Sequence, residues 1–281
     1  MSDRVIRFGK SDAQRFFTGD SWLSSILKTS YSEYEIFINA NDLYEDSITK
    51  LEEIRKRALR SVVIQYVNTG RLTGPDERGR RKYHMGLNNE KPFEHFAKMR
   101  NIVLNYVAKK ATIEPEFKYF VSIDSDVFVH SDAVSRLVDI MEINPDIYMC
   151  AIPVNNDRIG TKDNPRGKRW SESKYNFGYW LIFAKSADQS TARSLRSFPI
   201  DSGLLEVGYT GACCIMRTQP LVDNPSLRYT PHTYGEDLGF CHQIVKLGMK
   251  MCVDTSQVSL HYQDPRLFPA DKIAFDRREI V

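Results

Sequence analysis

The fold class is decided by the stretch Tyr119-Phe120-Val121-Ser122-Ile123-Asp124-Ser125-Asp126. Its opening residues are mainly apolar, which predicts a buried strand over 119–123. The triplet Asp124-Ser125-Asp126 follows directly, at the carboxyl end of that strand. Ligands of open parallel α/β sheets bind outside the carboxyl ends of the strands. The stretch therefore predicts an α/β fold whose binding site lies at this edge of the sheet.

Strands and helices are predicted to alternate on both sides of this stretch. Runs of β-branched and aromatic residues predict strands, and apolar residues spaced three and four apart predict helices. The predicted strands span 5–8, 35–39, 61–67, 147–154, 177–183, 212–216, 251–253 and 258–262. The predicted helices span 21–27, 47–59, 92–109, 131–143 and 236–247. Strands that alternate with helices are typical of an α/β domain with a parallel sheet.

Two segments lack such patterns and are predicted to be loops. Segment 70–91 is rich in glycine and charge, and a loop of that length is more typical of a lid than of a simple connection. Its basic run at 78–82 is interpreted either as solvated surface or as a loop that closes over a diphosphate or an anionic acceptor. A second basic loop is predicted over 155–174.

Composition favours one compact domain over residues 1–281. The net charge of +3 is too small to indicate a nucleic-acid partner. No run approaches the ~20 apolar residues of a membrane span, and the N-terminus lacks the apolar stretch of a signal peptide. The five cysteines lack Cys-x-x-Cys spacing and are expected to be reduced and buried. A cytoplasmic location is therefore expected; the oligomeric state is left open.

The carboxylates of Asp124 and Asp126 suggest a divalent metal site. Mg²⁺ and Mn²⁺ prefer oxygen ligands, and Mg²⁺ takes one or two protein carboxylates together with substrate phosphates. The alternative is that Asp124 caps the following turn while Ser125 and Asp126 face water. The triplet alone does not separate these interpretations.

Two later groups carry acid–base and metal-binding chemistry. Glu236 and Asp237 precede an apolar helical face, so they fall in the first turn, where the helix dipole favours negative charge. They are interpreted either as ordinary helix-start residues or as catalytic carboxylates, of which one could deprotonate an acceptor hydroxyl. His261 lies on a short apolar strand and could complete a metal site or be structural.

These three groups, in this order, resemble the core of the GT-A glycosyltransferases. Those enzymes carry an Asp-x-Asp triplet, a Glu-Asp pair that opens a helix, and a C-terminal His. The segments 35–42, 98–101 and 207–217 are also similar to conserved parts of that family. The resemblance implies a GT-A (Rossmann-like) α/β/α sandwich with a mostly parallel central sheet. It also implies a nucleotide-binding half at 1–154 and an acceptor and catalytic half at 155–281.

The resemblance further implies a hexosyltransferase-type enzyme that uses Mn²⁺ or Mg²⁺ and a nucleoside-diphosphate sugar, with a carbohydrate or glycoconjugate acceptor. The implied metal ligands are Asp124, Asp126 and His261. The implied donor-binding residues are Asn41, Asp42, Arg100, Asp124, Ser125 and Gly211. Glu236 and Asp237 are implied as catalytic, with Asp237 the base of an inverting reaction. A retaining GT-A enzyme, a sugar-phosphate nucleotidyltransferase and a carbohydrate-binding protein stay open as alternatives.

Overall fold

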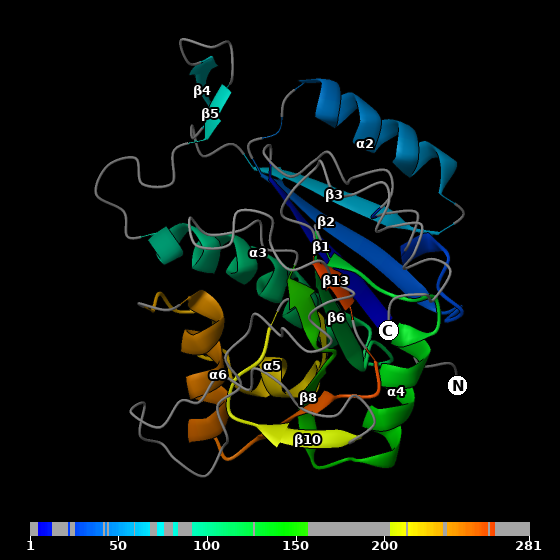
Figure 1. The fold of residues 1–281 in the computed structure, drawn as a ribbon, viewed down its shortest axis with the longest axis vertical. Coiled ribbons are helices and arrows are strands. Elements are labelled where there is room, and N and C mark those ends of the chain that lie inside the picture. The colour runs from blue at the N-terminus through cyan, green and yellow to red at the C-terminus, as the bar shows by residue number, and fades with distance from the viewer. Residues whose placement is uncertain are drawn as a thin grey trace, which may run out of the picture.

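A computed structural model gives the structure of most of the chain (Figure 1). It describes residues 5–12, 22, 26–41, 43, 45–58, 60–67, 72–75, 81–83, 92–125, 127–156, 203–211, 213–232, 235–257 and 259–261. The predicted aromatic strand 177–183 and most of the predicted basic loop 155–174 lie outside these residues.

An eight-stranded sheet forms the centre of the molecule, in the order β10-β12-β8-β11-β6-β1-β2-β3. The strands are β1 (Val5–Asp12), β2 (Tyr34–Asn41), β3 (Val62–Val67), β6 (Tyr119–Asp124), β8 (Ile147–Ala151), β10 (Leu204–Val207), β11 (Cys213–Arg217) and β12 (Lys250–Asp254). β11 runs antiparallel to both of its neighbours, and β10 runs antiparallel to β12. All other neighbouring strands in this sheet are parallel.

Helices cover both faces of the sheet (Figure 1). They are α2 (Glu45–Arg57), α3 (Pro92–Ile113), α4 (Ala133–Ile143), α5 (Gln219–Asp223) and α6 (Glu236–Lys246). Alternate residues of a strand point to opposite faces, and β2 follows this rule. Ile36 and Ile38 belong to a core with residues of α2 and α4, whereas Phe37 belongs to a second core with residues of α3 and α6. The two cores make a three-layer α/β/α sandwich.

A small sheet lies beside the end of β6, in the order β7-β13-β9. Its strands are β7 (Val127–Phe128), β9 (Val154–Asn156) and β13 (Ser259–His261). β13 pairs antiparallel with β7 and parallel with β9. It therefore brings the end of the described chain back to the residues that follow β6.

The predicted α/β sandwich is confirmed, with a sheet that is only partly parallel because β10 and β11 are reversed. The prediction of a loop throughout 70–91 is wrong, because this segment contains the antiparallel hairpin of β4 (Leu72–Pro75) and β5 (Arg81–Tyr83). Strand β10 and helix α5 were not predicted. The five cysteines are free and buried, as expected. In the part of the chain that the structure describes, no helix is long and apolar enough to cross a membrane.

Candidate active site

Three chain segments converge at the carboxyl end of β6. β6 ends at Asp124, and the register pairs Ile123 with Cys213 at the start of the antiparallel strand β11. Gly211, just before β11, therefore lies at the same edge. Helix α6 begins there too, after Gly235, whose φ of 130° is in the region that favours glycine. The acidic residues at the end of β6 and at the start of α6 therefore lie close together at this edge of the sheet.

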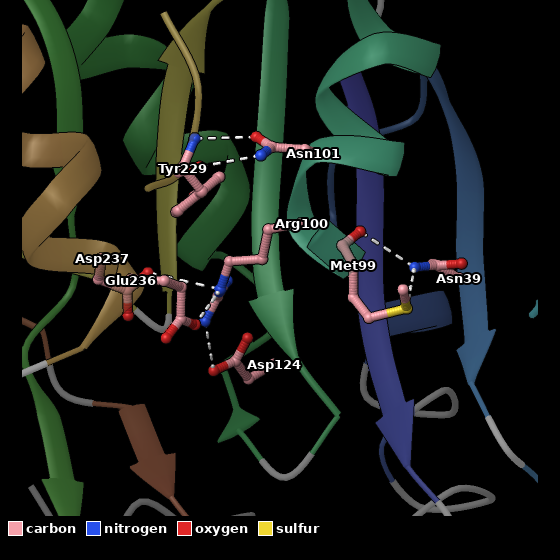
Figure 2. Close-up of polar contacts among 8 residues, drawn as sticks. All are labelled: Asn39, Met99, Arg100, Asn101, Asp124, Tyr229, Glu236 and Asp237. Atoms are coloured by element: carbon pink, nitrogen blue, oxygen red, sulfur yellow. Dashed lines mark hydrogen bonds and ion pairs between the residues drawn. The ribbon is translucent and has the colours of Figure 1, made fainter. Parts of the chain in front are cut away.

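Arg100 of α3 binds the acidic residues of both elements (Figure 2). Its Nη2 donates to Oδ2 of Asp124 at 3.1 Å, and its Nε donates to Oε1 of Glu236 at 2.8 Å. Oδ1 of Asp237 lies 3.5 Å from the same Nε. The side chain of Arg100 is only 4% exposed, so these ion pairs are largely shielded from water. We call Arg100, Asp124, Glu236 and Asp237 the Arg100 cluster.

The cluster contains three carboxylates and one guanidinium. Burial lowers the pKa of Arg100, but attraction to Asp124, Asp237 and Glu236 outweighs it and holds that pKa above its ordinary value. Arg100 therefore stays charged. With all three carboxylates ionised, one guanidinium leaves the four side chains with a net negative charge. This negative charge lies at the edge of the sheet where ligands of α/β folds bind.

Gly211 leaves the space in which the Asp237 carboxylate lies. A Cβ atom added to Gly211 would lie 2.7 Å from Oδ2 of Asp237. This distance is shorter than real side-chain contacts allow, so any other residue would displace the carboxylate or the backbone. The close approach predicted for Gly211 is thus made by a protein carboxylate in this structure; its approach to a donor sugar stays a prediction.

Asp124 presents one oxygen to Arg100 and keeps the other available. Its Oδ1 is buried and has no hydrogen-bond partner among the described residues. A buried carboxylate oxygen without a partner is costly, so a hydroxyl donor or a cation would stabilise it. This atom fits the predicted contact of Asp124 with a ribose hydroxyl or a metal. Ser125, next to it, is buried.

The other two predicted metal ligands are only partly described. Asp126 lies outside the described residues, and of His261 only the backbone is described. The register of β13 on β7 pairs His261 with Val127, the residue directly after Asp126 in the sequence. The backbone of His261 therefore returns to the chain next to the triplet. Among the described side chains, no group of three or more His, Cys, Asp or Glu residues could hold a metal ion.

Asn41 lies at the same sheet edge, on the far side of β1 from Asp124. It is the last residue of β2 and is fully buried, and its Nδ2 lies 2.9 Å from Nε2 of His95 on α3. Asn39, two residues earlier, donates from Nδ2 to the carbonyl of Met99 at 3.1 Å (Figure 2). Asp42 lies outside the described residues. The predicted nucleotide contacts of Asn41, Asp42 and Arg100 stay predictions.

Sequence reasoning missed Tyr229, whose ring packs against the guanidinium of Arg100. Its ring lies 5.3 Å from the Arg100 guanidinium carbon and stacks on Phe240 of α6 with ring centroids 4.4 Å apart. Burial raises the pKa of Tyr229 well above its ordinary value, so the phenol stays neutral. No local pattern marks Tyr229, since it lies in an irregular segment and its role depends on packing between α3 and α6.

Comparison with solved structures identifies similar proteins, although no protein-family model and no curated protein matches the chain. S. aureus TarS 1–349 in complex with UDP-GlcNAc is 13% identical, with a TM-score of 0.53 over 99% of this chain and 65% of that one. The same protein with UDP is 14% identical, with a TM-score of 0.52 over 95% of this chain and 62% of that one. The chain thus spans less than two thirds of these TarS chains. At such identities the likeness concerns the fold alone, and we conclude that the chain shares its fold with S. aureus TarS.

Proposed function

We propose that this protein is a metal-dependent, inverting glycosyltransferase. It would transfer a sugar, of the hexose type, from a nucleoside-diphosphate sugar to an acceptor hydroxyl. The observation that carries the proposal is the Arg100 cluster, which joins the acid at the end of β6 to both acids at the start of α6. The fold shared with TarS, which was solved with UDP and UDP-GlcNAc, supports a nucleotide-sugar donor.

Asp237 is the general base in this proposal. Its side chain is 13% exposed, more than the 8% of Glu236, so it is the more accessible acid of the pair. Its carboxylate would accept the proton of the acceptor hydroxyl as that oxygen attacks the anomeric carbon. The bond from this carbon to the diphosphate breaks, and the nucleoside diphosphate leaves. A positioned general base contributes roughly 10²–10⁴-fold to the rate.

Glu236 has a different task from its neighbour. Its Oε1 accepts the shorter hydrogen bond from Arg100, at 2.8 Å, and the whole residue is buried. It therefore anchors the guanidinium at the start of α6, and Asp237 is the acid that would meet the acceptor. The negative charges of the three neighbouring carboxylates repel one another. The positive charge of Arg100 offsets part of this repulsion.

Asp124, Asp126 and His261 are the residues that would hold Mn²⁺ or Mg²⁺. The unpartnered Oδ1 of Asp124 fits such a role, since hard cations prefer carboxylate oxygens. When bound, the metal would stabilise the negative charge of the departing diphosphate. The other residues act without it: Arg100 orders the acids and Asp237 takes the proton.

The test begins with ligand binding. Nucleoside diphosphates and their sugars are screened by thermal shift with and without Mn²⁺, because a ligand of the folded state raises its apparent stability. At least one is expected to bind more tightly with the metal. Sugar transfer from that donor to a panel of saccharides is then followed by mass spectrometry. If no nucleoside diphosphate binds, a carbohydrate-binding role takes precedence, whereas pyrophosphate formation from a sugar phosphate and a nucleoside triphosphate would indicate a nucleotidyltransferase.

The base is tested with Asp237→Asn. Turnover is expected to fall by roughly 10²–10⁴-fold while the donor dissociation constant changes little. Asp223→Asn is the control, since Asp223 is an exposed carboxylate that pairs with Gln219 on α5. Unchanged turnover in Asp237→Asn would refute the assignment. The anomeric proton coupling of the product reports inversion or retention.

A further inference from the structure

The segment before α6 is held by a side-chain amide of α3. Nδ2 of Asn101 donates to the carbonyl oxygen of Tyr229 at 2.9 Å, and the backbone N–H of Tyr229 donates to Oδ1 of Asn101 at 2.8 Å (Figure 2). Both backbone groups of one residue thus bind one amide. This pattern imitates the pair of bonds that a neighbouring β-strand would make.

A second amide holds the adjacent residue from α6. The backbone N–H of Arg228 donates to Oε1 of Gln243 at 3.1 Å, and Nε2 of Gln243 donates to the carbonyl oxygen of Arg228 at 2.6 Å. Arg228 and Tyr229 are consecutive in the chain. Helix α6 therefore binds the backbone of Arg228, and helix α3 binds the backbone of Tyr229. We call this short segment, 228–229, the amide bridge.

The amide bridge fixes the distance between the two helices. Gly239 of α6 packs directly on Thr230, and a Cβ atom on that glycine would overlap the carbonyl oxygen of Thr230. The Tyr229 ring fills the space between Phe240 and Arg100. Close packing on one side and paired hydrogen bonds on the other leave little freedom for α6 to shift relative to α3.

The two helices carry three of the four residues of the Arg100 cluster. Arg100 is the residue before Asn101 on α3, and Glu236 and Asp237 open α6. We infer that Asn101 is a positioning residue, which sets the acids of α6 against Arg100 and Asp124 through the amide bridge. The inference deepens the proposed function and rests on it for its catalytic consequence. A displacement of ~1 Å from productive geometry costs about 100-fold in rate.

The experiment compares Asn101→Ala and Asn101→Asp with Asn105→Ala. Asn105 lies one turn further along α3, and its Oδ1 accepts from Nε of Arg228, so it binds the side chain and not the backbone. Asn101→Asp keeps the shape and one acceptor but sets a carboxylate oxygen against the Tyr229 carbonyl. Both Asn101 variants are expected to lower kcat by about 30- to 100-fold. The KM for the donor is expected to stay within about threefold, and Asn105→Ala to keep kcat within about twofold.

Activity is expressed per folded protein, with the folded fraction taken from denaturant unfolding. A kcat loss in Asn101→Ala that matches the loss of folded protein, or equals that of Asn105→Ala, would overturn the inference. Hydrogen exchange gives a readout that does not depend on catalysis. The Phe240 and Cys241 amides of α6 are expected to exchange about tenfold faster in both Asn101 variants and unchanged in Asn105→Ala. If the wild type transfers no sugar, the proposed function fails, and unchanged exchange would separately refute the amide bridge.

Discussion

Gly211 lies against Asp237 so closely that the aspartate carboxylate occupies the space of a missing side chain. The two residues come from different parts of the fold, one from the segment before β11 and the other from the first turn of α6. Their contact is a sensitive point of the site, because the smallest enlargement of Gly211 acts directly on the proposed base.

Gly211→Ala is expected to lower kcat by about 100-fold while nucleotide binding is preserved, because the new methyl group displaces the Asp237 carboxylate. Steady-state kinetics and donor titration measure the two effects. Gly248→Asn serves as the control: Gly248 follows α6 at a φ of 70°, which Asn tolerates, and a Cβ there meets no atom within 4 Å. Full activity in Gly211→Ala would show that Asp237 can shift without loss and is not the base.

Arg100→Ala removes the cation that three carboxylates share. The free energy of unfolding is expected to fall by about 3–5 kcal/mol, since the acids are left without a buried partner. Arg100→Lys is expected to recover part of this stability but to keep kcat at least about tenfold lower, because one ammonium cannot reproduce the planar fork of a guanidinium. Denaturant unfolding and kinetics separate the two effects.

Arg217→Lys is the matched control for Arg100→Lys. Arg217 binds the backbone carbonyls of Ile147 and Asn144 at the opposite end of the sheet, where it pairs in register with Tyr119. Its replacement is expected to reduce stability and leave kcat unchanged. Equal losses of kcat in both lysine variants would mean that Arg100 acts on stability alone.

Gly239→Ala tests the packing of α6 on the segment before it. Because the new methyl group would overlap the Thr230 carbonyl, we expect a loss of about 1–3 kcal/mol in the free energy of unfolding. The gain in helix propensity from glycine to alanine, up to about 1 kcal/mol, would offset part of this loss. A more stable variant, measured by urea unfolding, would show that the helix moves away at no cost.

His242 is expected to make stability depend on pH. Burial is the largest cause that lowers the pKa of His242 below its ordinary value of 6.5. Electrostatic interactions with His232 and Lys246 lower this pKa further. The unfolded chain therefore binds more protons between the folded pKa and about pH 6.5, so stability is lost as pH falls through this window. His242→Gln is expected to flatten the slope, by at most about 1.4 kcal/mol per pH unit. His232→Gln should flatten this slope less, because His242 stays buried in that variant. Identical slopes in the wild type and in His242→Gln would show that His242 is not the source of the pH dependence.

Local patterns were enough to predict the framework of the site. The apolar run of β6 ends at Asp124, and the first turn of α6 holds Glu236 and Asp237, so both could be located from periodicity and position. The predicted α/β class followed from the alternation of such elements, whereas the sandwich was implied by the GT-A resemblance. What the sequence could not supply is the partner of these acids: Arg100 lies 136 positions from Glu236 and 24 from Asp124. Only the packing of α3 brings them together.

The missed elements are short and carry weak signals. β10 is an edge strand whose residues alternate between exposed and more buried positions, but its sequence Leu-Leu-Glu-Val does not alternate between polar and apolar residues. The hairpin of β4 and β5 is rich in the glycine, proline and charge that normally indicate loops. Helix α5 has five residues and begins with Gln219 and Pro220. Each depends on tertiary contacts more than on its own composition.

The position of β11 has a consequence for assembly during synthesis. Among the described strands, β11 alone connects the block β3-β2-β1-β6 with the block that contains β8 and β12. A ribosome that has released only the residues up to β9 has made the block β3-β2-β1-β6 and strand β8, but not β10, β12 or the joining strand β11. The exposed edges of β6 and β8 are then free to pair with other chains. Such a nascent chain is vulnerable to aggregation until Cys213–Arg217 emerges and closes the sheet.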